Sequence, residues 1–227
     1  FVQSWAELRD ERALEILAQI DNQFAFIASV TGLNVSRKRW TMEWLTIVIQ
    51  FAIAVESRIK HAFACYRPVD LSPQVQPIIT TPGHSSYPMG HAAQAFATMV
   101  ALCGLLKIKS GSKVYTQLYR QARRISVNRT VAGVHFPIDA AAGQALGYSL
   151  GEFVLCASAV KDGTVNPKCF DRTFVPVGNG DDLANDYLGE GPEKPHGCTT
   201  GTTPLAVTKS DILEKLAALA REEWDLP

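Results

Sequence analysis

The sequence predicts an all-α fold, in which a helical bundle is followed by an irregular, loop-rich C-terminal region. Apolar residues recur at spacings of three and four through most of residues 1–160, as expected for amphipathic or buried helices. No segment there shows the competing strand pattern of alternating apolar and polar residues. The 227 residues, 47% hydrophobic and 19% charged, suffice for one substantial core, so we predict a single domain over residues 1–227.

The first two predicted helices lie before residue 69. Residues 6–32 carry apolar side chains at helical spacing, and Gly32 is placed to end that helix. Residues 39–68 predict a long and mostly buried helix, which Pro68 stops because proline cannot continue the backbone hydrogen bonding.

Three further helices follow a loop and complete the bundle. The third covers residues 89–106, which are small and apolar, and the fourth covers residues 112–133. The fifth covers residues 137–159, with Pro137 suited to a first helical turn.

The C-terminal region has a different composition. Residues 161–204 are rich in glycine, proline, asparagine and aspartate, which predicts a long loop or an extended tail. Residues 210–224 predict a closing amphipathic helix capped by Ser210 or Asp211.

Charge and hydropathy exclude several classes of partner. Lys plus Arg (22) balances Asp plus Glu (22), so no nucleic-acid partner is expected. The longest apolar stretch, 140–160, is interrupted by Gln144 and Glu152, and we expect a buried bundle helix there rather than a membrane span. We expect a soluble protein. The sequence does not predict its compartment, and export stays open.

The five cysteines fall into two groups. Cys65, Cys103 and Cys156 lie in helical patterns, where buried free thiols are expected. Cys169 and Cys198 lie in the predicted tail and could pair in an oxidising compartment. No Cys-x-x-Cys spacing indicates zinc.

Two basic residues interrupt the second helix. Lys60 and Arg67 lie seven residues apart, about two helical turns, which would place them on one face with Arg67 at the helix end. A solvated basic face shared with Arg58 is the simpler interpretation of these two residues alone.

A second group lies where the fourth helix passes into the fifth. Asp139 follows His135 by four residues, so its carboxylate can reach one ring nitrogen and present the other outward as base, nucleophile or ligand. Arg129 lies in the same segment. The alternative is that Asp139 only caps a helix N-terminus.

The third group opens the third helix. Gly90 allows backbone N–H groups to approach a ligand at the positive end of the helix, and His91 projects into the same space. Together with the other two groups, these residues predict a site for a tetrahedral oxyanion such as phosphate or vanadate.

The order and spacing of these groups resemble the three-part signature of the vanadium haloperoxidase and acid phosphatase (PAP2-type) superfamily. Its three parts match, in order, Lys60-x6-Arg67-Pro68, then Pro88-Met89-Gly90-His91, then Arg129-x5-His135-x3-Asp139. The resemblance covers residues 60 to about 151 and is closer to the haloperoxidase branch.

The resemblance implies a role for each residue. Three cations would neutralise the oxyanion, and Gly90 would donate a backbone N–H; the cations are Lys60, Arg67 and Arg129. His135 would bind vanadium directly or become phosphorylated, with Asp139 orienting it. His91 would be the general acid/base.

Two positions depart from the family pattern. Met89 occupies the anion-contacting position where the family usually has serine, so a hydroxyl donor is missing. Asn128 replaces a serine before the arginine, which is a milder change.

The implied function is that of a vanadium-dependent, bromoperoxidase-like oxidoreductase. Vanadate held by His135 would activate hydrogen peroxide, Lys60 would polarise the bound peroxide, and bromide or iodide would be oxidised to halogenate a small organic acceptor. His84 would tune the halide preference, unless it is a plain loop residue. The alternatives are a phosphomonoesterase with a phosphohistidine intermediate and a bundle without activity; a homo-oligomer is also open.

Overall fold

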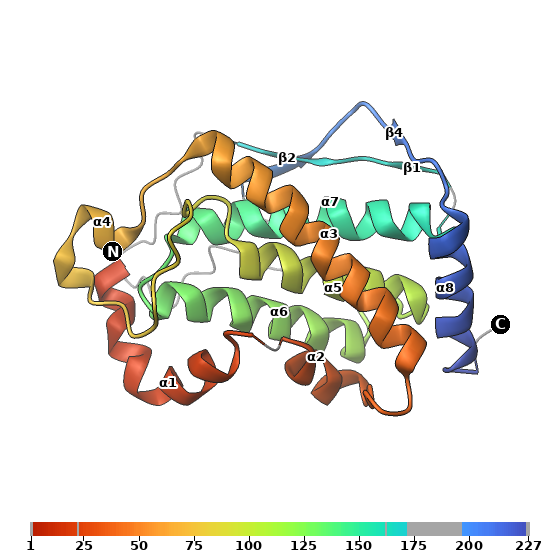
Figure 1. Cartoon of the computed structure of the whole chain (residues 1–227), viewed down its shortest axis with the longest axis horizontal. Coiled ribbons are helices and arrows are strands. Elements are labelled where there is room, and N and C mark those ends of the chain that lie inside the picture. Colours follow the sequence, from red (N-terminus) through yellow and green to blue (C-terminus); the bar gives the residue numbers. More distant parts are fainter. Residues whose placement is uncertain (1, 22, 162, 172–196, 226–227) are drawn as a thin grey trace.

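The computed structural model describes residues 2–21, 23–161, 163–171 and 197–225, without the side chain of residue 3. It confirms the all-α class, with helices over most of the described chain and little strand (Figure 1). The helical elements are η1 (Val2–Leu8), α1 (Arg9–Ala18), α2 (Phe24–Thr31), α3 (Arg39–Phe63), α4 (Pro68–Leu71), η2 (Pro73–Val75), α5 (Gly90–Leu105), α6 (Lys113–Val131), α7 (Pro137–Ala157) and α8 (Asp211–Glu222).

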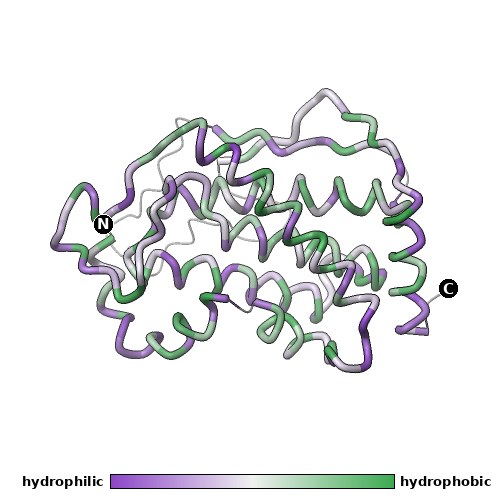
Figure 2. The backbone as a smooth tube through the Cα atoms, viewed as in Figure 1, coloured by the Kyte–Doolittle hydropathy of each residue, from purple (hydrophilic) through white to green (hydrophobic). Residues whose placement is uncertain are grey.

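Helix α5 lies at the centre of the bundle and packs against α3, α6 and α7 (Figure 1). Its contact with α7 is close because glycines of α7 face its backbone: a Cβ at Gly143 would lie 2.5 Å from the carbonyl oxygen of Met89, and one at Gly147 would lie 2.7 Å from that of Ala93. In Figure 2 the hydrophobic residues lie in runs along these bundle helices. The close packing fixes the N-termini of α5 and α7 beside each other.

The prediction of one helix over residues 6–32 is wrong in the middle of that range. The chain leaves helical geometry between α1 and α2, and the carbonyl oxygens of Gln19 and Ile20 face the Nε2 atom of His91 at 3.1 and 3.2 Å. Gly32 ends α2 as predicted, in the left-handed conformation (φ 69°).

The second predicted helix ends earlier than Pro68. Helix α3 ends at Phe63, and Ala64 takes a left-handed conformation (φ 47°). Pro68 instead begins α4, where the carboxylate of Asp70 accepts a hydrogen bond from the backbone N–H of Arg67 at 2.8 Å. Arg67 therefore does not lie on the helix that carries Lys60, and the shared helix face is a wrong prediction.

The predicted tail forms two short antiparallel pairs in its described parts. Strand β1 (Thr164–Val165) pairs with β4 (Leu205–Ala206), and β2 (Lys168–Phe170) pairs with β3 (Cys198–Thr200). Both tail cysteines are free thiols on these strands. Residues 172–196 of the tail lie outside the described residues, and the single-domain assignment stays a prediction.

Helix α8 closes the bundle by packing against α3 (Figure 1). The hydroxyl of Ser210 caps it by accepting from the backbone N–H of Leu213, which decides between the two predicted caps. Across the described part of the chain, no helix combines the length and hydropathy needed to cross a bilayer.

Candidate active site

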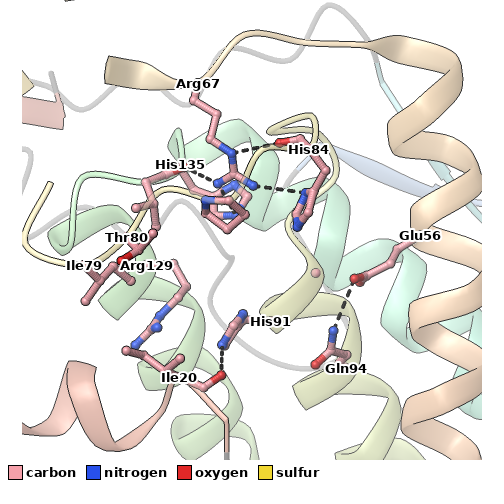
Figure 3. Close-up of a pocket in the computed structure, with 13 residues that line it drawn as sticks. Ile20, Glu56, Arg67, Ile79, Thr80, His84, His91, Gln94, Arg129 and His135 are labelled. Atoms are coloured by element: carbon pink, nitrogen blue, oxygen red, sulfur yellow. Dashed lines mark hydrogen bonds between the residues drawn. The ribbon is translucent and has the colours of Figure 1, made fainter. Parts of the chain in front are cut away.

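A cavity of about 280 Å³ lies where α3, α5, α6 and the loop before α7 converge. Figure 3 shows its lining, with His91 near the middle of the view. Six of the nine residues that the sequence assigned to the site line this cavity, although they come from distant segments: Arg67, His84, Gly90, His91, Arg129 and His135.

His135 lies just before α7 and is held through its Nδ1 atom. Nδ1 lies 3.1 Å from the Oδ2 atom of Asp139, which also accepts from the backbone N–H of Phe136 at 2.9 Å. The carboxylate of Asp139 therefore both caps the N-terminus of α7 and orients the ring of His135. The two interpretations, a helix cap and a partner of His135, apply together. Burial lowers the pKa of His135 to about 4, against the opposing effect of Asp139. The neutral ring donates from Nδ1 and keeps its lone pair on Nε2.

Ser86 is a site residue that the sequence analysis missed. Its hydroxyl donates to the same Oδ2 atom of Asp139 and lies 3.4 Å from Nδ1 of His135. Nothing in the spacing of the sequence relates this loop serine to residues of α7. Its contact with Asp139 is therefore seen only in the folded structure.

Arg67 is buried and spans the top of the cavity (Figure 3). Its guanidinium donates to the carbonyl oxygens of Val134 at 2.7 Å and His84 at 3.0 Å. It also contacts two ring nitrogens at 3.2 Å, Nε2 of His135 and Nδ1 of His84. Burial lowers the pKa of Arg67 below its usual value. The alternative of a solvated basic face is therefore wrong for this residue.

Arg129, on α6, is 1% exposed, and only part of its guanidinium is hydrogen-bonded within the described structure. Its Nη2 atom donates to the carbonyl oxygen of Ile16 at 2.8 Å. Its Nε and Nη1 atoms are buried without a hydrogen-bond partner among the described residues. Burial lowers the pKa of Arg129 to about 10, so the side chain is a cation at neutral pH. A buried cation with unpaired donors is suited to an anion.

His91 occupies the first turn of α5 and is neutral. Its Nε2 atom lies within hydrogen-bond distance of two carbonyl oxygens, those of Gln19 and Ile20. Since carbonyls only accept, Nε2 carries the proton and Nδ1 keeps the lone pair. Burial lowers the pKa of His91 to about 3, and the positive charge of Arg129 acts in the same direction.

Two predicted anion ligands do not line the cavity within the described structure. The Lys60 ammonium donates to the carbonyl oxygens of Ser85 at 3.1 Å, Ser86 at 3.2 Å and Pro88. Met89 is fully buried in the hydrophobic core. Lys60 therefore holds the loop that carries His84, and Met89 anchors the start of α5.

Glu56 and Gln94 line the cavity although the sequence analysis did not single them out (Figure 3). The carboxyl group of Glu56 lies against Gly90, where a Cβ would be 2.4 Å from Oε1. Burial raises the pKa of Glu56 to about 7, and the charge of Lys60 opposes this shift. The available signal was an acidic residue four positions before Lys60, directly after the apolar run of residues 51–55.

The fold and the cavity define a helical protein with a buried, cationic site suited to a tetrahedral oxyanion. In comparison with protein families, residues 41–161, more than half of the chain, match the PAP2 superfamily. The chain belongs to this superfamily, whose members are generally enzymes of phosphatase or haloperoxidase type. A comparison with curated proteins finds no match.

Proposed function

We propose that this protein is a vanadium-dependent haloperoxidase that uses hydrogen peroxide to oxidise bromide or iodide. Vanadate is the proposed cofactor, bound through Nε2 of His135. When bound, V(V) supplies Lewis-acid activation of hydrogen peroxide. The acceptor of the oxidised halide is a small organic molecule.

The residues of the cavity fit this anion. The unpaired Nε and Nη1 donors of Arg129 suit its oxygens. Arg67 at present donates to Nε2 of His135 at 3.2 Å. A ligand bond from Nε2 would displace this contact and make one N–H of Nη1 available to an anion oxygen, while the other N–H donates to the carbonyl oxygen of Val134.

The state of His91 is the observation that carries the proposal. Peroxide activation needs a base that accepts a proton, and a base must be unprotonated at working pH. His91 meets this requirement because it lines the anion cavity and its Nε2 proton is held by backbone carbonyls, which leaves the lone pair of Nδ1 available. Burial lowers the pKa of His91 to about 3 in the ligand-free protein, and the negative charge of a bound anion would raise this pKa toward the working range of a base. The lone pair on Nδ1 then takes up the peroxide proton. The contact of His84 with Arg67 supports the halide-tuning role of His84.

A phosphomonoesterase is the second candidate, and the position of Lys60 favours it. The ammonium donates to three backbone carbonyls and lies outside the cavity lining, so it does not face the site where peroxide would be polarised. Hydrolysis with His135 as the nucleophile does not require Lys60 to polarise a bound peroxide.

Two assays on the same preparation distinguish the candidates. Apoprotein in phosphate-free buffer is incubated with vanadate and assayed for bromide oxidation with hydrogen peroxide; a second sample without vanadate is assayed for p-nitrophenyl phosphate hydrolysis. We expect vanadate-dependent bromide oxidation that inorganic phosphate inhibits. Hydrolysis without any bromide oxidation would reject the haloperoxidase in favour of the phosphatase.

A further inference from the structure

Resting on the proposed oxyanion site, we infer that the carboxyl group of Glu56 binds the anion directly, donating a hydrogen bond from Oε2 to one of its oxygens. The ligand class is a tetrahedral oxyanion, phosphate or vanadate. In this position Glu56 supplies the side-chain hydroxyl donor that the chain lacks at Met89.

The hydrogen bonds around Glu56 decide which oxygen carries the proton. Oε1 accepts from the amide nitrogen of Gln94 at 3.2 Å. The amide oxygen of Gln94 in turn accepts from Gln23 at 3.0 Å, which fixes the amide with its nitrogen toward Glu56. Oε2 is buried and has no partner among the described residues. An acid proton therefore resides on Oε2.

The place of the carboxyl group also indicates a ligand. Glu56 is 5% exposed and lines the same cavity as Arg129 and His91 (Figure 3). Its Oε1 and Oε2 atoms lie 2.4 and 2.9 Å from where a Cβ of residue 90 would be, so only glycine at that position admits it. The carboxyl group is thus held at the N-terminus of α5, where an anion is also favoured.

Protonation decides whether Glu56 attracts or repels an anion. Burial raises the pKa of Glu56 to about 7. The groups that face it or share its cavity come from every surrounding element: Lys60 on α3, His91 and Gln94 on α5, Arg129 on α6, and Arg67, His84 and His135 on the loops. The positive charge of Lys60 opposes the shift, whereas a bound anion favours the acid further. Anion binding above neutral pH therefore takes up a proton.

The test is calorimetric titration of the full chain with inorganic phosphate at pH 5.5 and pH 8.5. Glu56→Gln keeps a donor at both pH values, whereas Glu56→Ala has none. The ratio of Glu56→Gln affinity to wild-type affinity cancels the titration of phosphate itself. We expect a ratio near one at pH 5.5 and a ratio of about ten or more at pH 8.5, where the wild-type carboxyl is ionised. Glu56→Ala should bind about tenfold more weakly than wild type at pH 5.5.

Two controls separate this inference from the proposed site. Arg129→Met removes the unpaired donors and should abolish phosphate binding, while Glu152→Gln, at a partly exposed position of α7, should bind as wild type does. Wild type and Glu56→Gln binding with the same pH dependence, while Arg129→Met does not bind, would overturn the role of Glu56 alone. Failure of wild type to bind phosphate at either pH would overturn both proposals.

Discussion

Replacing Arg129 by methionine should make the protein more stable without ligand and unable to respond to phosphate. The guanidinium is 1% exposed, and its Nε and Nη1 atoms find no partner among the described residues. A buried cation in this state destabilises the ligand-free fold, and an anion relieves that destabilisation. Methionine retains much of the apolar stem without the charge.

The magnitude follows from the pKa of Arg129, which burial lowers from its usual value to about 10. At pH 7.5 the side chain is protonated in both folded and unfolded chains, so the full penalty applies, roughly 3 kcal/mol for such a shift. Loss of the hydrogen bond to Ile16 lowers the stability of the variant by about 1 kcal/mol. The net gain in the free energy of unfolding for Arg129→Met is therefore about 2 kcal/mol.

Urea unfolding at pH 7.5, with and without 10 mM phosphate (roughly a hundredfold excess over a 100 μM dissociation constant), measures both effects. For such a site, wild type should gain about 2.7 kcal/mol from phosphate. Arg129→Met should gain nothing. A variant that is several kcal/mol less stable than wild type, yet still stabilised by phosphate, would show that Arg129 is structural and would refute the reasoning.

Three further predictions concern single side chains of the site. His135→Ala should lose vanadate on desalting, whereas His91→Ala should retain it and lose turnover, because only His135 is proposed to bond the metal; equal vanadium contents in the two variants would contradict this division. Met89→Ser should leave phosphate affinity within about twofold and lower the free energy of unfolding by about 2–5 kcal/mol, because Met89 lies in the core; tighter phosphate binding by calorimetry would place the side chain at the anion instead. His84→Phe should change the KM for bromide and leave vanadium content unchanged, since His84 lines the cavity beside Arg67 and is not proposed to bond the metal; identical bromide and iodide kinetics would remove its halide role.

The helices of the bundle could be predicted because their signals are local. Apolar spacing and end signals, such as Gly32 in its left-handed conformation and Ser210 as a cap, depend only on neighbouring residues. The strands after α7 could not be predicted this way, because each is two or three residues long and pairs with a segment more than 25 residues away.

The convergence of the site could also be predicted, because three motif segments with one chemistry imply one ligand. The direction in which each side chain points could not be predicted from the sequence. Lys60 faces the carbonyls of its neighbouring loop, and Met89 faces the core, because backbone carbonyls and core packing compete for side chains in ways that spacing does not encode.

The contacts of His91 and Glu56 depend on tertiary structure alone. His91 is held by carbonyls that become available only because the chain breaks its helix between α1 and α2. Glu56 reaches the cavity only because residue 90 lacks a Cβ. Neither event has a pattern within a single helix.

The measurement that tests the central claim most directly is vanadate titration of the apoprotein, followed by bromide oxidation with hydrogen peroxide at each point. The account predicts activity that rises with vanadate to saturation at one equivalent per chain, and that phosphate suppresses by competition. Saturable vanadate binding without any halide oxidation would contradict the haloperoxidase, and no binding of either anion would contradict the oxyanion site itself.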